Sequence, residues 1–394
     1  MRRALVSCIG VITLSAATLP AAATTVDEVI ARHIAAKGGD KWDEIRTMRI
    51  TGDFTAFSKV GPFTLIRARD KRYRIDHTMN ERRVIVGYDG EQPWWDNEWM
   101  EAGPQPISDP VELAALEREL DFTTPLFDYE ERGFTVKLVE ERNEIDGFPA
   151  IAIELVRDDE SVETWFLDPD THLELARESP GSDFGVPQPS LTFFDDFHEI
   201  GGVMIPHYVE TQFYARDRMM RVRDVELNVD LDDQAFSMPV ATGMESFQSM
   251  LGDWTVKVES KQSPRQPEFA ESSRESVITA SLNGGLIEER FSTQGAQAVR
   301  TLSYDRHREH YVMTQMNDTE TYLDIQVGPL VNGALTVSNV ETGTTSMNFR
   351  FTLHERSTIS GLSKDGFTIQ RENSFDGGQN WAVMQKLTYT RKDG

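Results

Sequence analysis

Two parts of the chain meet in the stretch DDQAFSMPVATGMESFQSMLGDW, residues 232–254. Its first residues resemble the end of a strand-rich region, and residues 240–243 are small and flexible. Residues 244–251 predict one short amphipathic turn, and Gly252-Asp253-Trp254 begins a second series of alternating strands. A change of composition followed by a new strand series indicates a domain boundary. We place it between residues 241 and 242.

The N-terminus has the pattern of an export signal. Arg2 and Arg3 form a charged region, Leu5 to Leu19 an apolar region, and Ala21 to Ala23 a small-residue cleavage site. We therefore expect a signal peptide at residues 1–23 and a periplasmic mature protein. No later stretch approaches the roughly 18 apolar residues of a membrane-spanning helix, so we expect no transmembrane segment.

Cys8 is the only cysteine of the chain. Leu5-Val6-Ser7-Cys8 matches the residue types of a lipoprotein box, but cleavage there leaves most of the apolar run on the mature protein. The arginine pair also hints at twin-arginine export, although the flanking residues of that signal are missing. Plain secretion is favoured. The mature chain then has no disulfide, thiolate nucleophile or cysteine-ligated metal.

Length and charge narrow the class of protein. With 394 residues, the chain is long enough for two hydrophobic cores. Its 65 acidic side chains outnumber 40 basic ones, for a formal net charge of −25. Such a surface repels nucleic acid and anionic membranes. A nucleic-acid partner is therefore not expected.

Residues 24–241 predict an antiparallel meander with few helices. Thr25 to Glu28 has the residues of a capping box, and Gly38-Gly39 ends the helix that follows. Asp109-Pro110 begins a second helix, with an apolar stripe of leucines. Elsewhere hydrophobic residues alternate with period two, and Asp-Gly and Gly-Gly turns separate the strands.

Several segments of this part resemble the LolA/LolB-like outer-membrane lipoprotein-carrier superfamily. They are the helix closed by Gly38-Gly39, the turn Ile145-Asp146-Gly147, and the segments Trp165 to Thr171 and Phe197 to His207. The resemblance implies a half-open antiparallel β-barrel with helices lying across an apolar cavity. No cargo-gating residue of the family can be placed on this chain. The resemblance therefore supports the fold better than it supports lipoprotein transport.

Residues 242–394 predict a second, closed barrel. About nine short strands with glycine hairpins and almost no helix are typical of a closed antiparallel β-barrel. Gly252-Asp253-Trp254 on the first strand and Arg391 after the last are similar to the lipocalin-like (calycin) arrangement. Ser303-Tyr304-Asp305 and the hairpin residues 374–381 resemble a bacterial family of unknown function with such a barrel. That resemblance implies that Trp254 plugs the closed end and that Arg391 lies over its ring. The fold class is thus mainly β (α+β).

The sequence favours a non-enzymatic carrier of lipid-like ligands in the first barrel. Burial of acyl methylenes gives about 0.8 kcal/mol each, so one fatty chain contributes on the order of 10 kcal/mol without a polar motif. The residues expected to line this site are apolar residues of the predicted strands: Ile50, Phe54, Phe63, Leu65, Trp94 and Trp95. For Trp94 and Trp95 the alternative is core packing, because adjacent strand residues face opposite sides.

Three other readings stay open. A small hydrolase or isomerase requires a buried carboxylate–histidine pair with a shifted pKa. A haem-binding barrel requires one interior histidine, from His307, His310 or His354. An adaptor for an envelope protein partner requires an outer apolar patch. No nucleophile elbow, zinc helix or phosphate loop occurs, so no catalytic residue, cofactor or metal site is assigned.

Overall fold

The computed structural model describes residues 25–100, 103–183, 185–213, 216–293, 295–319, 322–348 and 351–392. The expected signal peptide, with Cys8, lies outside the described residues. Two compact units divide the chain: the described residues of 1–45 and 121–222 form one, and those of 46–120 and 223–394 form the other.

A large antiparallel sheet contains every described strand before residue 230 except the two of a small hairpin. Its strand order is β6-β5-β4-β3-β2-β1-β15-β14-β13-β12-β11-β10-β7. The division between the two units falls within β15. The strands are β1 (Thr47–Ala56), β2 (Lys59–Ala68), β3 (Tyr73–Met79), β4 (Arg82–Tyr88), β5 (Pro93–Asn97), β6 (Gln105–Pro106), β7 (Thr135–Leu138), β8 (Glu144–Ile145), β9 (Phe148–Pro149), β10 (Ile151–Val156), β11 (Val162–Leu167), β12 (Glu174–Asp183), β13 (Val186–Ile200), β14 (Val203–Phe213) and β15 (Arg216–Leu227).

Among the described residues, two α-helices accompany this sheet, and both begin where the sequence predicts. Thr25 caps α1 (Val26–Lys37) in a complete capping box with Glu28. Asp109 caps α2 (Pro110–Glu119) by accepting from the amides of Val111 and Glu112. Short 3-10 turns are η1 (Gly39–Glu44), η2 (Glu98–Met100), η3 (Asp233–Phe236) and η4 (Glu245–Met250).

Gly38 ends α1 for a steric reason. Its φ of 116° is in the left-handed region, and its amide bonds back to the carbonyls of Ala35 and Ile34. A side chain at this position would collide with the backbone of Gly202 and Val203, at the turn between β13 and β14. Glycine therefore lets the helix end pack directly against that turn.

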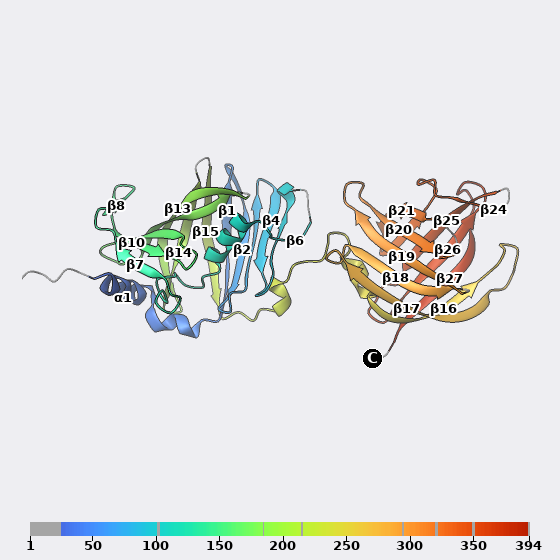
Figure 1. Ribbon diagram of the computed structural model, residues 1–394, viewed down its shortest axis with the longest axis horizontal. Helices are drawn as coiled ribbons and strands as arrows, with labels where there is room; N and C mark the ends of the chain where they lie inside the picture. The colour runs from blue at the N-terminus through green and yellow to red at the C-terminus, as the bar shows by residue number, and fades with distance from the viewer. Residues whose placement is uncertain are drawn as a thin grey trace, which may run out of the picture. The chain divides into compact units, whose positions relative to one another are not determined.

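The second half of the chain forms a closed barrel of ten antiparallel strands (Figure 1). The ring runs β23-β21-β20-β19-β18-β17-β16-β27-β26-β25 and closes where Leu335 of β23 pairs with Ile359 of β25. The sequence predicted about nine strands and missed β21. The strands are β16 (Gly252–Ser260), β17 (Ala270–Ser281), β18 (Leu286–Thr293), β19 (Ala296–Asp305), β20 (His310–Asn317), β21 (Asp324–Gly328), β22 (Leu330–Val331), β23 (Ala334–Ser338), β24 (Ser346–Asn348), β25 (Phe351–Ser360), β26 (Gly366–Ser374) and β27 (Ala382–Arg391).

One end of the barrel is filled by its own apolar side chains. Trp254, Leu335 and Tyr389 are almost fully buried there. Phe247 and Met250 of η4 join this core, so the short amphipathic turn expected before Gly252 packs against the barrel floor. Opposite walls of a closed sheet supply side chains to one another, which explains this complete burial.

Candidate ligand-binding site

One row of apolar side chains crosses five strands of the sheet. Cross-strand pairing places Ile50 opposite Leu65 and Leu65 opposite Ile75. It then places Ile75 opposite Val86 and Val86 opposite Trp95. Directly opposed residues share one face of a sheet, so these five side chains, which we call the apolar row, form one surface. Three of them, Ile50, Leu65 and Trp95, are among the residues that the sequence assigned to the ligand site.

Helix α2 covers the apolar row without burying all of it. Leu116 of α2 is buried, and Leu113 and Leu120 pack in the same cluster. Leu65 and Trp95 nevertheless stay only partly buried. Within the described residues, the indole N–H of Trp95 is shielded from solvent and has no hydrogen-bond partner. A buried donor without an acceptor costs about 1–3 kcal/mol, so this surface is suited to an added molecule.

Phe54 and Phe63 lie on the same face but are more deeply packed. Phe63 pairs across the strands with His77, and the Phe54 ring lies 4.3 Å from the His77 ring. Both phenylalanines are buried, with 5% and 3% exposure. They therefore form a filled floor beside the apolar row.

Trp94 lies on the opposite face of the sheet. It is 0% exposed, and its indole N–H donates to the carbonyl of Phe236 at 2.9 Å. A side chain at Gly87, its cross-strand neighbour, would collide with the indole. Adjacent residues of a strand point to opposite faces, so Trp94 packs in a core under η3 while Trp95 joins the apolar row.

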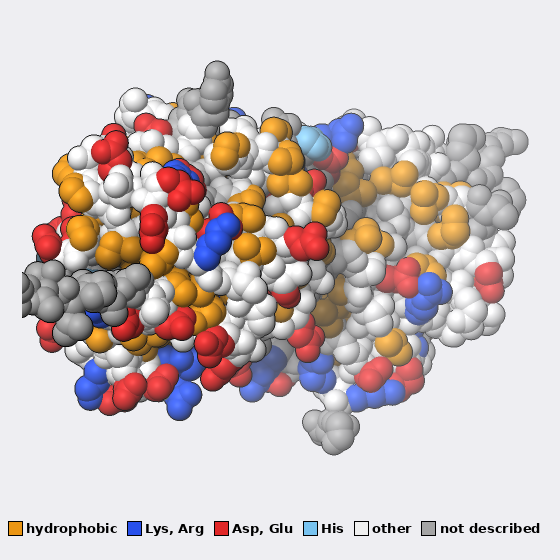
Figure 2. All heavy atoms as spheres, turned by 60° about the vertical axis from the view of Figure 1, so that its left-hand side comes forward, with side chains coloured by type: hydrophobic (Ala, Val, Ile, Leu, Met, Phe, Trp, Pro, Cys, Tyr) orange, Lys and Arg blue, Asp and Glu red, His pale blue; other side chains and the backbone are white. Residues whose placement is uncertain are grey.

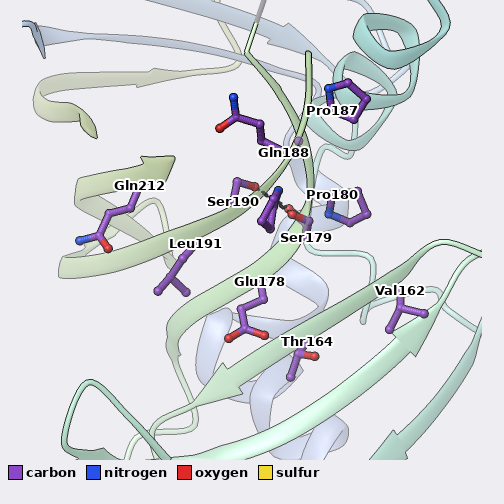
Figure 3. A pocket seen from close by; sticks show the side chains of 12 residues that line it. Val162, Thr164, Glu178, Ser179, Pro180, Pro187, Gln188, Ser190, Leu191 and Gln212 are labelled. Carbon is purple, nitrogen blue, oxygen red and sulfur yellow. Dashed lines mark hydrogen bonds between the residues drawn. The ribbon is translucent and has the colours of Figure 1, made fainter. Parts of the chain in front are cut away.

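The other unit carries an open groove of about 690 Å³ where two strands separate (Figure 3). Pairing of β11 with β12 ends at Thr164 and Glu178, although β12 continues to Asp183. Pro180 and Pro187 lie on one side of the groove, and Leu191 and Gln212 lie on the other. The sequence analysis did not find this groove, because it depends on where strand pairing stops.

The polar groups of the groove are engaged with one another. Arg142 donates two hydrogen bonds to the Glu178 carboxylate, both 2.7 Å long. The hydroxyls of Ser179 and Ser190 lie 3.1 Å apart. Proline removes backbone donors from the strand edge, which limits strand addition there. The groove thus offers a mainly apolar surface.

On the face turned to the viewer in Figure 2, exposed hydrophobic side chains lie among many carboxylates.

A buried carboxylate–histidine pair exists, but its groups hold α1 in place. His33 Nδ1 donates to the carbonyl of His172 at 2.9 Å, and Nε2 lies 3.2 Å from the hydroxyl of Thr124. Glu174 lies 3.9 Å from His33 and forms an ion pair with Lys37 at 3.1 Å. Burial lowers the pKa of His33, which keeps the imidazole neutral. The pKa of Glu174 is also lowered: burial opposes this shift, but the charge of Lys37 outweighs it.

At the closed end of the barrel, Arg391 lies over Trp254 with 4.3 Å between the guanidinium carbon and the ring centre. The Trp254 indole N–H donates to the carbonyl of Met250 at 2.7 Å. Arg391 donates to the carbonyls of Leu251 and Ser249, at 2.9 and 2.8 Å, and to that of Lys364. One side chain therefore ties the η4 segment to the last strand of the barrel.

The histidines considered for haem do not face the barrel interior. His310 lies beside Tyr311, whose side chain is in the barrel core, and His307 is exposed in the preceding turn. On β25, Ser357 faces inward, and His354, three residues earlier, therefore lies on the outer face. In the described part of the chain, no three His, Cys, Asp or Glu residues are grouped to hold a metal ion. No described helix has the length and apolarity to span a membrane.

Comparison with known proteins finds a family model that matches part of the chain. The family described as "Protein of unknown function (DUF1579)" matches residues 213–391, from the end of β14 through the barrel. None of the curated proteins compared with the chain matches it.

The chain is also similar to solved bacterial structures. A DUF1329 family protein from Desulfovibrio piger is 14% identical over 55% of this chain and 98% of its own, with a TM-score of 0.38. A LolA superfamily protein from Nitrosomonas europaea is 16% identical over the same shares, with a TM-score of 0.36. The MucA/MucB complex of Pseudomonas aeruginosa aligns at 10% identity over 91% of this chain and 93% of its own, with a TM-score of 0.21.

Proposed function

We propose that the protein is an exported, periplasmic binding protein for apolar or amphiphilic, lipid-like ligands. Its binding surface lies where α2 covers the apolar row. The observation that carries this proposal is incomplete burial. Leu65 and Trp95 keep exposed surface beneath a helix that already buries Leu116. An apolar chain on this surface removes it from water at about 25 cal/mol per Å².

Amphiphile binding is also supported by apolar side chains that are exposed after β1 and at the end of η2. Phe57, in the turn between β1 and β2, is 44% exposed, and its ring lies 5.8 Å from that of Trp99. Met100, at the end of η2, is 46% exposed. The indole N–H of Trp99, like that of Trp95, is shielded without a partner among the described residues. A ligand that carries a hydrogen-bond acceptor satisfies either of these donors.

Ligand retention is the first test. Protein purified from its native envelope is analysed by native mass spectrometry, and bound lipids are extracted and identified. We expect a fraction of the protein to carry one acyl-containing molecule. Empty protein in repeated preparations, together with no measurable binding of added oleate, contradicts the proposal.

A filling substitution tests the site itself. Leu65→Trp adds volume to an incompletely filled surface, so we expect little loss of thermal stability and at least a fivefold loss of oleate affinity. Ile66→Trp is the matched control on the opposite face, where Ile66 is buried against Phe236. Overpacking there costs about 1–3 kcal/mol. If Leu65→Trp destabilises as much as Ile66→Trp, the row is already filled.

The domain boundary between residues 241 and 242 is part of the same proposal. The strands of the large sheet precede it and those of the barrel follow it. Residues 242–394, expressed alone, are expected to give a cooperative unfolding transition. We also propose that Trp254 and Arg391 have a structural role in barrel closure.

A further inference from the structure

The groove beside β11 and β12 lies on the face of the sheet that α1 does not cover. Trp165 of β11 packs with Val29 and Ile30 of α1. Adjacent residues of a strand point to opposite faces, so Thr164, which lines the groove, points away from α1. The groove volume of about 690 Å³ is comparable to that of small-molecule sites.

One cross-strand row of side chains crosses the groove. Pairing places Glu178 opposite Thr164, Leu191 opposite Glu178 and Gln212 opposite Leu191. All four residues line the groove and share one face of the sheet. Neighbouring strands lie about 4.8 Å apart, so Glu178 and Gln212 are separated by about 10 Å. The groove therefore has a Glu178 end and a Gln212 end.

The apolar part of the groove is rigid. Val162 is 45% exposed, and the lining residues Pro180, Pro187 and Pro189 are exposed as well. A proline ring fixes its backbone φ and has almost no rotamer freedom to lose when another molecule covers it. An apolar molecule that binds here therefore orders few protein groups, which favours binding.

The charge at the Glu178 end is compensated within the protein. Arg142 donates two hydrogen bonds of 2.7 Å to the two oxygens of the Glu178 carboxylate. Such a bidentate pair neutralises both groups and fixes their geometry. This end of the groove therefore selects neither a cation nor an anion.

The Gln212 end presents a hydrogen-bond acceptor. Gln212 Nε2 donates to Glu210 Oε1 at 3.0 Å. An ionised carboxylate only accepts hydrogen bonds, so the amide nitrogen of Gln212 must be the atom that faces Glu210. The carbonyl oxygen Oε1 of Gln212 is then left for a donor in the groove, where Gln212 lies beside Leu191 (Figure 3).

Negative charge backs this acceptor. The hydrogen bonds from Gln212 and Tyr208 lower the pKa of Glu210, which keeps the carboxylate ionised. Within the described residues, no lysine or arginine forms an ion pair with Glu210, and Arg221 lies over the Tyr208 ring at 5.0 Å. Asp217, directly opposite Gln212, is exposed. The Gln212 end therefore has surplus negative charge.

We propose that this groove binds a small amphiphile that carries a protonated amine. The ammonium group donates to Gln212 Oε1 and lies beside the Glu210 carboxylate, and the apolar chain covers Leu191 and the proline rings. The formal net charge of −25 adds a long-range attraction for such cations. This site is separate from the apolar row and does not depend on the function proposed for it.

The test uses the full-length mature protein at pH 7 and octylamine, which is then an ammonium ion. Octanol and octanoate are the neutral and anionic probes of equal chain length. In NMR titrations of 15N-labelled protein, we expect octylamine to shift the Gln212 side-chain amide and the Leu191 backbone amide saturably. Octanol is expected to bind there at least fivefold more weakly, and octanoate is expected to cause no saturable shift.

Two variants separate a specific site from general attraction to an acidic surface. Glu210→Gln keeps the shape and removes the charge, so we expect at least a tenfold loss of octylamine affinity. Glu199→Gln is the matched control, because Glu199 is an exposed carboxylate of β13 outside the groove, opposite Met204. We expect it to change the affinity less than twofold. Equal losses in the two variants overturn the proposal.

A blocking variant tests the position of the apolar chain. Val162→Trp adds volume at a half-exposed residue of the groove, so we expect little loss of thermal stability and at least a fivefold loss of octylamine affinity. If Glu210→Gln unfolds, the three probes on the wild type decide alone. No saturable shift at Gln212, or equal affinity for octylamine and octanol, overturns the proposal. Leu65→Trp is expected to leave these shifts unchanged, which separates this groove from the apolar row.

Discussion

The apolar row of the sheet and the apolar floor of the barrel are built from the same residue types but are filled differently. Leu387 and Ile369 in the barrel are each 1% exposed, whereas Leu65 in the row stays partly buried. A closed sheet supplies its own second wall, so opposing side chains interdigitate. An open sheet depends on a separate helix, and α2 offers only one apolar stripe. Closure of the barrel thus creates a fully buried core, whereas partial cover of the sheet by α2 leaves an apolar surface for ligands.

Polar groups follow the opposite trend. On the sheet, within the described residues, the indole N–H groups of Trp95 and Trp99 are shielded without a partner. Inside the barrel, a whole layer is polar and contains Arg274, Glu289 and Arg300. Apolar surface is left open on the sheet, whereas the barrel encloses charged groups that pair with one another. The two regions therefore differ in the chemistry of the side chains that they enclose.

The largest effect is expected for Trp254→Ala in the barrel floor. Truncation of a fully buried tryptophan costs about 3–5 kcal/mol, and here it also removes the contacts with Met250 and Arg391. Trp95→Ala in the incompletely filled row is expected to cost less, about 1–2 kcal/mol. Guanidinium denaturation followed by circular dichroism measures both. Equal losses would remove the contrast between the two regions.

The next largest effect concerns the ion pair that fixes α1. Lys37→Met leaves the buried carboxylate of Glu174 uncompensated, which costs about 3 kcal/mol. Lys37→Met combined with Glu174→Gln removes the charge and is expected to recover most of this loss. The same denaturation measurement applies. A double variant as unstable as the single one shows that shape, rather than charge, holds α1.

A smaller effect is expected at the start of α2. Asp109→Ala removes the side-chain cap of Val111 and Glu112 and costs about 1 kcal/mol of helix stability. We expect faster amide exchange in α2 and a changed oleate affinity. Thr25→Ala, the corresponding change at α1, is the control and is expected to leave oleate binding unaffected. A comparable effect of both changes on oleate affinity counts against a specific role of α2.

The smallest effect is a pH dependence from His33. Because burial lowers its folded-state pKa below the usual 6.5, the unfolded chain binds a proton first as the pH falls. Stability from neutral His33 is present above about pH 6.5, the unfolded value, and is lost progressively below it. Melting temperatures at pH 7.5 and 5.5 are compared for wild type and His33→Gln. We expect a larger decrease in the wild type, and equal decreases would contradict this assignment.

Local chemistry made much of the architecture predictable. The capping box of Thr25 and Glu28, the αL stop at Gly38 and the cap Asp109 all depend on neighbouring residues, and the structure confirms them. Short strands between glycine turns likewise indicated a barrel. The missed strand β21 has only five residues, and its inward positions include Asp324 and Gln326, so it lacks an apolar alternating pattern.

The sites were less predictable, because they depend on register. Ile75 and Val86 belong to strands that the sequence identified, yet only cross-strand pairing brings them into one row with Leu65 and Trp95. The burial of Trp94 could not be predicted either, because strand alternation alone does not say which face of the sheet is covered. The groove at Glu178 required knowledge of where β11 ends.

Sequence by itself determined the strand-rich composition, the helix ends and the alternation of each strand, because these follow from interactions between residues close in the chain. Tertiary structure alone decided which faces meet. It enclosed Arg274 with Glu289 and Arg300, residues of three different strands, and it left the Trp95 face incompletely covered. Pairing partners and second layers come from distant parts of the chain, so no local pattern encodes them.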